Sequence, residues 1–127
     1  YLDDYAHHPE EIQSTIDSVK ELFPNRKLTV IFQPHLFSRT KDFAGAFAKS
    51  LSQADELILL DIYPAREKPI LGVDSSMLLN LCTNEFKRNI DKDEVLYYLE
   101  NKENDVVLTL GAGDICDLVN PIKSILG

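Results

Sequence analysis

The first dozen residues carry a dense run of side chains able to bind or orient a ligand. Two carboxylates, a phenol and two imidazoles stand together in Asp3-Asp4-Tyr5-Ala6-His7-His8-Pro9. Pro9 suits the first position of a helix, where its missing N–H is not needed. Glu10 and Glu11 complement the positive end of the helix dipole. The run predicts a strand-to-helix turn that presents polar groups to a ligand.

A second polar run, Phe32-Gln33-Pro34-His35-Leu36-Phe37-Ser38-Arg39-Thr40, follows the next predicted strand. Arg39 offers a planar donor fork that suits a carboxylate or a phosphate. Ser38 is expected to cap the following helix. Two more loops, Tyr63 to Lys68 and Gly111 to Asp114, also follow predicted strands. In parallel sheets such loops meet at the carboxyl edge, where ligands bind, so the four loops predict one site.

Several kinds of chemistry are disfavoured by the spacing of these residues. Adjacent histidines point in different directions, so His7 and His8 do not resemble a zinc site, and His8 is expected to cap the helix. Asp3 and Asp4 should face opposite sides of a strand, which argues against a shared-proton pair. One of them is instead expected to face the ligand, as acidic residues that bind ribose hydroxyls do. We identify no catalytic nucleophile and no metal ligand.

The segment from Gly111 to Asp114 begins like a dinucleotide-binding fingerprint but departs from it. Cys116 occupies the position of the third glycine, so we interpret the segment as a tight turn with Asp114 as a helix cap. The chain also contains no Walker A sequence, and it cannot cradle a nucleoside triphosphate in that way by itself.

The 127-residue chain has a formal net charge of −8, which argues against a general nucleic-acid-binding surface. A local positive potential can still oppose the global sign. The predicted loops after the strands hold most of the groups that could form such a pocket, namely His7, His8, His35, Arg39, Arg66 and Lys68. We therefore expect one positive pocket for an anionic small ligand.

The two cysteines, Cys82 and Cys116, lack metal-ligand spacing and are interpreted as free thiols, with Cys116 buried in a helix. No apolar run approaches the roughly 20 residues that a membrane span needs, and no signal peptide is recognised. These features predict a cytoplasmic location. The chain begins inside a predicted strand and without Met, which suggests a piece of a longer protein.

The hydrophobic pattern alternates between helix and strand along the chain. Helices are expected over residues 9–23, 39–53, 75–81, 93–100 and 114–126, the last one kinked or broken at Pro121. Strands are expected over residues 28–32, 57–62, 88–90 and 106–110. Near-continuous apolar strands that alternate with amphipathic helices indicate an α/β fold, with a mostly parallel sheet covered by helices on both faces.

Four motifs, in this order and spacing, resemble the C-terminal domain of the Mur ligase family. They are Asp-Asp-Tyr-Ala-His-His-Pro at 3–9, Phe-Gln-Pro-His with Ser-Arg-Thr at 32–40, Tyr-Pro-Ala-Arg-Glu-Lys-Pro-Ile at 63–70 and Gly-Ala-Gly-Asp-Ile at 111–115. The resemblance covers the whole chain. It implies a Rossmann-like fold and a single domain, residues 1–127, at the end of a three-domain enzyme. The N-terminal UDP-binding domain and the central ATP-binding domain would lie outside this chain.

The resemblance also implies an activity, ATP-dependent acid–amino-acid ligation in peptidoglycan synthesis. Its alanine-adding members join L-alanine to UDP-N-acetylmuramate through an acyl phosphate, with ATP and Mg²⁺ held mainly by the central domain. Asp4 would then lie on the nucleotide side, while Tyr5, His7, His35 and Arg39 would face the substrate. Arg39 would grip the carboxylate of the amino acid. By itself, the fragment is expected to fold but to be inactive.

Two alternatives stay open at this point. A related ligase that recycles murein tripeptide shares the opening motif, although the run at 32–40 favours the alanine-adding type. The same residues could also serve a non-catalytic nucleotide- or amino-acid-binding module. The chain departs from many family members at Leu36, where a second arginine is common, so any contact of that arginine is lost or made differently.

Overall fold

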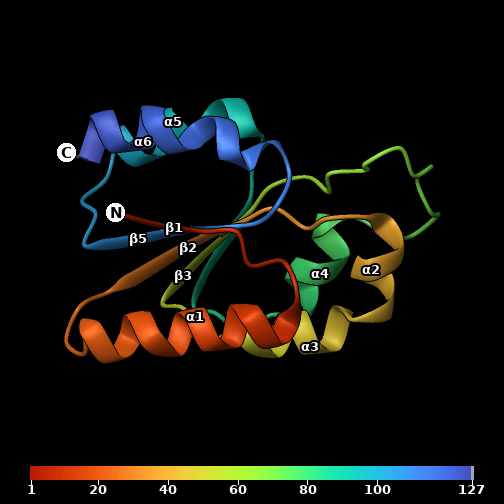
Figure 1. Ribbon diagram of the computed structural model, residues 1–127, viewed down its shortest axis with the longest axis horizontal. Coiled ribbons are helices and arrows are strands. Elements are labelled where there is room, and N and C mark those ends of the chain that lie inside the picture. The colour runs from red at the N-terminus through yellow and green to blue at the C-terminus, as the bar shows by residue number, and fades with distance from the viewer. Residues whose placement is uncertain (127) are drawn as a thin grey trace.

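Five parallel strands form one sheet in the order β1-β5-β2-β3-β4 (Figure 1). The computed structural model describes residues 1–126 of the chain. The strands are β1 (Leu2–Asp4), β2 (Leu28–Phe32), β3 (Glu56–Leu59), β4 (Phe86–Asn89) and β5 (Val106–Leu110). The three inner strands are buried along their whole length, whereas the edge strands β1 and β4 are partly exposed. This confirms the predicted parallel α/β fold.

Helices cover both faces of the sheet (Figure 1). One layer holds α1 (Pro9–Leu22), α2 (Phe37–Asp42), α3 (Ala44–Leu51) and α4 (Ser75–Leu81), and the other holds α5 (Val95–Glu100) and α6 (Val119–Leu126). From β1 to β4 the chain moves across the sheet in one direction, and then it returns to place β5 between β1 and β2. Because such crossovers are right-handed, the reversal puts α5 on the opposite face.

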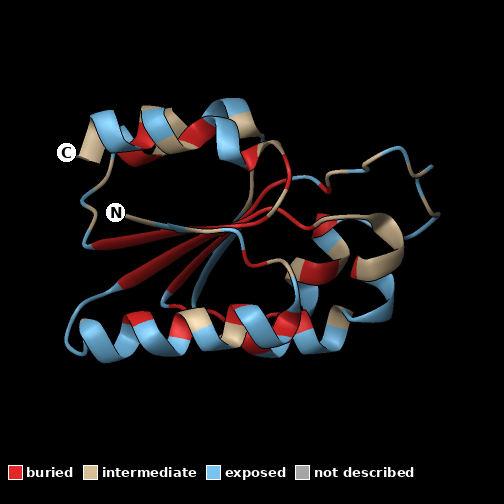
Figure 2. Cartoon of the chain, viewed as in Figure 1, coloured by how far each residue is buried: buried red, intermediate tan, exposed pale blue. Residues whose placement is uncertain are grey.

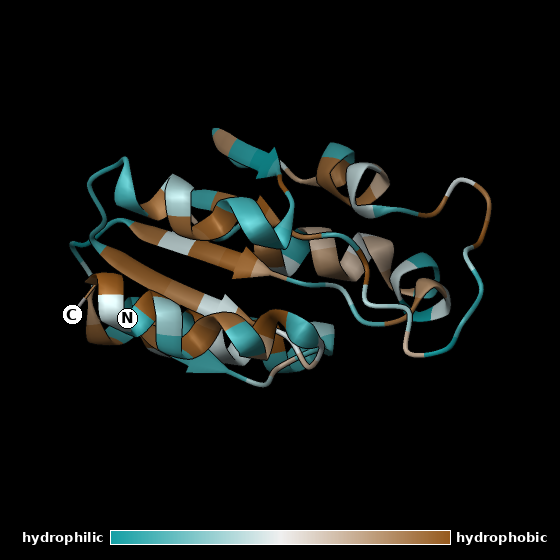
Figure 3. Cartoon of the chain, turned by 90° about the horizontal axis from the view of Figure 1, so that it is seen from above, coloured by the Kyte–Doolittle hydropathy of each residue, from teal (hydrophilic) through white to brown (hydrophobic). Residues whose placement is uncertain are grey.

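The core consists of two hydrophobic clusters, one on each face of the sheet (Figure 2). Residues of the inner strands alternate between them: Val30 and Phe32 join the cluster under α1 and α3, while Ile31 joins the cluster under α5 and α6. The inner strands are accordingly apolar on both faces, as Figure 3 shows. This explains why their sequences read as continuous hydrophobic runs.

The predicted helix over 39–53 is in fact two helices. α2 begins at Phe37 and ends before Phe43, which also stands at the N-cap of α3. Gly45, a poor helix former, lies two residues later in the first turn of α3 and disfavours a continuous helix through this point. Because α2 begins before Ser38, the prediction that Ser38 caps the helix is wrong.

The last predicted helix also divides, but not at Pro121. A 3-10 helix, Asp114–Leu118, precedes α6, and Pro121 lies in the first turn of α6, where a backbone N–H has no partner within the helix. The threefold period of the 3-10 helix turns Ile115 and Leu118 inward and leaves Cys116 exposed, so the expectation of a buried Cys116 is wrong. The cap is Gly113 rather than Asp114.

The remaining elements agree with the sequence to within a few residues. The strands over 28–32 and 106–110 and the helix over 75–81 are confirmed without change. A short 3-10 helix, Lys92–Glu94, opens the segment predicted as helix 93–100. Within residues 1–126 no helix has the length and apolarity required to cross a bilayer.

Candidate functional site

The predicted loops meet where the strand order reverses. β1 and β2 lead into helices on one face, whereas β5, which lies between them, leads into the 3-10 helix and α6 on the other face. The loops after these strands therefore diverge to opposite faces at this point of the carboxyl edge. In open α/β sheets such a switch point is the usual position of a ligand site.

Three of the predicted site residues form one group at this edge. The ring centroids of His7 and His35 lie 5.9 Å apart, and the guanidinium Nη1 of Arg39 lies 3.3 Å from Nδ1 of His35. His35 and Arg39 stand four residues apart, at the turn that opens α2. His35 also stacks on the ring of Tyr63 at 5.7 Å. The tertiary structure thus brings the loops after β1, β2 and β3 to a single group.

The hydrogen bonds assign a direction to each imidazole. An arginine can only donate, so Nδ1 of His35 accepts from Arg39 and the proton of the neutral ring lies on Nε2. Nδ1 of His7 lies 3.1 Å from the carbonyl of Tyr5, which can only accept, so Nδ1 of His7 carries the proton. His35 therefore offers a donor from Nε2, whereas neutral His7 offers an acceptor.

His35 is held in its neutral form. Partial burial lowers the pKa of His35, and the nearby charges of Arg39 and His7 lower it further, while Glu67 acts in the opposite sense. Of the pair His35 and Arg39, the positive charge consequently belongs to Arg39. That arrangement suits a singly charged ligand group such as a carboxylate.

Tyr5 and His8 border the same group. The phenol ring of Tyr5 is 63% exposed and its centroid lies 6.1 Å from that of His7. His8 occupies the N-cap position of α1, as predicted, and its backbone N–H donates to Glu11 at 3.2 Å. Its ring packs edge-on against Phe43, with the ring centroids 6.1 Å apart. Both rings line a hollow of about 430 Å³ together with residues of α1 and α3.

Asp4 points away from this group. Its two carboxylate oxygens accept from the backbone N–H of Ala6 at 3.1 Å and from the hydroxyl of Thr15 in α1 at 2.8 Å. Asp3 lies on the other face of the strand and accepts from Thr109 at 2.5 Å. The prediction that Asp3 and Asp4 diverge is confirmed. The structure places Asp4 beside α1 and not with the histidine–arginine group.

Sequence reasoning missed the side chain that ties the loops together. Gln33 is 5% exposed; its amide donates to Asp114 at 2.6 Å, and its carbonyl accepts from the backbone of Ile115 at 2.9 Å. A Cβ on Gly113 would lie 2.5 Å from Gln33 Oε1 and 2.7 Å from Tyr63. Gly113 thus permits close packing, while Gly111, with φ +139°, supplies the turn. Polar Gln33 after a buried strand was the available signal.

Asp114 accepts a hydrogen bond from Gln33 and does not cap the following helix. Besides Gln33, it binds Lys92 at 3.1 Å. Burial opposes ionisation of Asp114, but the bonds from Gln33 and Lys92 outweigh it and lower the pKa of this carboxyl. Within residues 1–126, no group of three or more His, Cys, Asp and Glu side chains is placed to hold a metal ion.

Arg66 and Lys68, which the sequence placed in the expected positive pocket, form no contact with the histidine–arginine group. Arg66 and Lys68 are exposed, and among residues 1–126 neither side chain forms a hydrogen bond or an ion pair. The residues of this loop that reach the site are Tyr63, which stacks on His35, and Glu67, which binds Ser38. Sequence reasoning had assigned neither of them a role, although both lie in a quoted motif.

The sequence of the chain matches a known protein family. The family described as Mur ligase, glutamate ligase domain, matches residues 1–113. The UDP-N-acetylmuramate–L-alanine ligase of Flavobacterium psychrophilum is 55% identical over 97% of this chain. The chain spans 28% of that relative's length. It thus corresponds to roughly the size of one domain of such a protein.

Solved structures of similar proteins share the fold. The UDP-N-acetylmuramate–alanine ligase of Thermotoga maritima is 32% identical, with a TM-score of 0.66 over 95% of this chain and 26% of that one. A murein peptide ligase of Psychrobacter arcticus gives a TM-score of 0.73 over 98% of this chain and 26% of that one, at 19% identity. At that identity the likeness concerns the fold alone.

Proposed function

Because the chain belongs to the Mur ligase family and represents its C-terminal domain, we propose that it completes an ATP-dependent ligase that adds L-alanine to UDP-N-acetylmuramate. The observation that carries this proposal is the 55% identity, across nearly the whole chain, to a relative of that name. The murein peptide ligase is only 19% identical to this chain, so its likeness concerns the fold and gives no support for murein peptide as the substrate.

In the proposed reaction ATP transfers its terminal phosphoryl group to the lactyl carboxylate of UDP-N-acetylmuramate and leaves as ADP. The amine of L-alanine then attacks the acyl phosphate, and inorganic phosphate leaves as the amide bond forms. We propose no Mg²⁺ ligand in this domain. ATP and Mg²⁺ are proposed to bind mainly to the central domain of the full-length protein. The remaining tasks of this chain are to bind the amino acid, to orient it and to enclose the substrates.

Arg39 is the group we propose for the carboxylate of L-alanine. Its guanidinium is fixed from one side by His35 and keeps further N–H groups for a charge-assisted pair. His35 can add a donor from Nε2, and His7 and Tyr5 would line the same pocket. Neutral His7 offers an acceptor, which suits the amine end of an amino acid.

Asp4 is proposed to lie on the nucleotide side of the site. Two of its acceptor positions are used by Ala6 and Thr15. A carboxylate has about four lone-pair sites, so Asp4 keeps capacity for a ribose hydroxyl. Its separation from the histidine–arginine group is consistent with nucleotide and amino acid binding at different places along the edge.

The reason to carry these groups on a separate domain is the sensitivity of an acyl phosphate to water. Domain closure over the substrates would exclude water before the chemistry begins. If the amino-acid-binding arginine comes from the closing domain, closure depends on bound amino acid. This is induced fit, in which substrate binding assembles the site.

An ADP-release assay on the full-length protein tests the proposal. It contains ATP, Mg²⁺ and UDP-N-acetylmuramate, with either L-alanine or murein tripeptide as the acceptor. We expect turnover with L-alanine. Turnover with the tripeptide alone would show that the protein is the recycling ligase instead. No turnover with either acceptor would favour a non-catalytic binding module.

A further inference from the structure

In the described part of the chain, the segments 34–39 and 63–67 contain every residue other than glycine that has a positive φ. Leu36, Ala65 and Arg66 have φ values of +71°, +45° and +75°, and no other non-glycine residue among 1–126 has a positive φ. Such conformations cost free energy and persist only where the surrounding structure holds them. Their concentration in two adjoining loops beside the site points to a unit that is kept in one shape.

Backbone hydrogen bonds join the two segments. The N–H of Tyr63 donates to the carbonyl of Pro34, and the N–H of Leu36 donates to the carbonyl of Tyr63, both at 2.8 Å. These bonds extend the parallel pairing of β2 and β3 past the ends of the strands. They also hold Leu36 in its left-handed conformation and place His35 against the ring of Tyr63.

The second segment then turns back toward α2. The N–H of Glu67 donates to the carbonyl of Pro64 at 2.8 Å, and this closes a tight turn through Ala65 and Arg66. A positive φ at both central residues is the signature of a type I′ turn. The turn directs the carboxylate of Glu67 at the first turn of α2.

Glu67 does for α2 what a capping side chain does for other helices. The N-cap of α2 is Leu36, which makes no side-chain capping bond, and the first turn of α2 contains no acidic residue. Glu67 accepts from the backbone N–H of Ser38 at 3.0 Å and from the Ser38 hydroxyl. These bonds lower the pKa of Glu67, so that it is a carboxylate at neutral pH, as the positive end of a helix prefers.

Arg39 is the next residue of the same helix turn. The direction of its guanidinium depends on the orientation of α2, which has only six residues and little intrinsic stability. We infer that Glu67 is a positioning residue for amino-acid binding: by fixing the first turn of α2 against the 63–67 loop, it sets the direction of Arg39 beside His35. The inference rests on the proposed function, because it concerns the use of Arg39 as the carboxylate-binding group.

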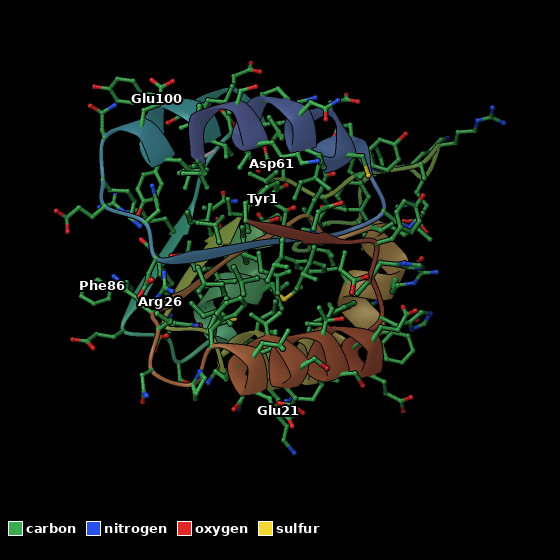
Figure 4. All side chains as sticks on the ribbon, turned by 60° about the vertical axis from the view of Figure 1, so that its left-hand side comes forward. Tyr1, Glu21, Arg26, Asp61, Phe86 and Glu100 are labelled. Carbon is green, nitrogen blue, oxygen red and sulfur yellow. The ribbon has the colours of Figure 1, made fainter. Side chains whose placement is uncertain are left out.

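The first test asks whether the contact holds α2 in place. Hydrogen exchange with mass spectrometry on the full-length protein should show faster exchange over residues 37–42 in Glu67→Ala than in the wild type. Glu67→Gln keeps an acceptor oxygen for Ser38 and should show an intermediate rate. Glu21→Ala is the matched control, because Glu21 lies on the solvent side of α1 (Figure 4). Unchanged exchange over 37–42 in Glu67→Ala would overturn the inference.

The second test asks whether the contact serves the amino acid. In the ADP-release assay, Glu67→Ala should raise the KM for L-alanine about 10- to 100-fold. A binding group such as Arg39 that is displaced by about 1 Å loses roughly that much of its effect. The KM values for ATP and UDP-N-acetylmuramate should stay within about twofold of wild type, since their proposed sites do not depend on α2. Glu67→Gln should recover most of the loss, because the neutral acceptor still pairs with Ser38.

The outcomes separate the inference from the proposed function. If Glu67→Ala raises all three KM values together, or leaves the KM for L-alanine unchanged, the positioning role is overturned. The proposed function then still stands, because the wild type turns over with L-alanine. A wild-type protein without alanine-dependent turnover overturns the proposed function instead, and with it the role of Glu67 in binding L-alanine, whatever hydrogen exchange shows.

Discussion

Arg39 and His35 define each other's chemistry through one contact. The guanidinium supplies the proton of the 3.3 Å bond, so the imidazole presents its Nε2–H outward and stays neutral beside the positive charge. The pair therefore offers a cation and a neutral donor side by side. A carboxylate can accept hydrogen bonds from both groups, and the charged one contributes more, which makes Arg39 the most informative position to change.

Arg39→Ala in the full-length protein should raise the KM for L-alanine about 10- to 100-fold, because a charge-assisted hydrogen bond to a carboxylate is lost. Initial-rate measurements with saturating ATP and UDP-N-acetylmuramate give this value. Lys41→Ala removes an exposed cation from the same helix and serves as the control. An unchanged KM for L-alanine would remove Arg39 from the site.

His35 has a consequence for pH dependence. Its pKa in the folded chain lies below the usual 6.5, so the folded state prefers the neutral ring. Its contribution to stability is full above pH 6.5 and is lost as the pH falls through the lower, folded-state pKa. His35→Gln should therefore weaken the fall in unfolding free energy below pH 6.5, measured by urea titration of the 127-residue chain at several pH values. An identical pH profile in both proteins would contradict this account.

At the scale of elements, one buried carboxylate fastens α5 to the sheet. Glu56 in β3 is 5% exposed and binds Lys102 at 2.9 Å, Thr29 at 2.9 Å and the hydroxyl of Tyr98. Burial by itself would raise the pKa of Glu56, but these hydrogen bonds outweigh it and lower the pKa. The network lies at the amino edge of the sheet, opposite the site, and fixes the position of α5 against β3.

Tyr98→Phe should lower the unfolding free energy of the 127-residue chain by about 2 kcal/mol at pH 7, because the hydrogen bond to ionised Glu56 is lost. Burial and Glu56 raise the pKa of Tyr98 to about 12 from the ordinary 10.0. The stability contributed by this proton is full below pH 10 and is lost as the pH rises toward 12. Urea unfolding at pH 7 and between pH 9 and 11.5 measures both effects.

Tyr97→Phe is the matched control for this element, because Tyr97 is the neighbouring residue of α5 and is 72% exposed. It should leave the unfolding free energy within about 0.5 kcal/mol of wild type. Equal effects of the two substitutions would show that the contact between Tyr98 and Glu56 does not stabilise the seat of α5.

For the whole molecule, the two hydrophobic clusters cover both faces of the sheet and leave the loops free at its carboxyl edge. Those loops bring together an arginine, three histidines and two tyrosines, which we propose form one wall of a site, on a chain of net charge −8. A single wall can orient an amino acid but cannot enclose a nucleotide and a sugar. The full activity thus needs the domains that the proposed function places elsewhere in the protein.

The 127-residue chain should fold in one cooperative transition but should not catalyse ATP-dependent alanine addition. Its core is large enough for independent stability, whereas the proposed ATP site lies outside it. Urea unfolding followed by circular dichroism tests the first statement, and the ADP-release assay tests the second, with the full-length protein in parallel. Alanine-dependent turnover by the chain alone would contradict the proposed division of labour.

The sequence by itself determined the class of fold, and it predicted the edge of the sheet at which the candidate site lies. Alternating helical periods and continuous apolar runs specify a parallel sheet covered on both faces, because each element must bury its own apolar surface. Polar loops at the ends of those runs then locate the ligand edge. The motif containing His35 and Arg39 was also visible, since the two residues are only four positions apart. These features all depend on local order along the chain.

The tertiary structure alone decided which loops meet and what they do there. The contacts between His7 and His35, Gln33 and Asp114, and Ser38 and Glu67 join residues 28 to 81 positions apart. No local pattern encodes such pairs, because they follow from the insertion of β5 between β1 and β2 and from the turn at Ala65. The outward position of Cys116 has the same origin, since packing against the sheet overrides helix propensity.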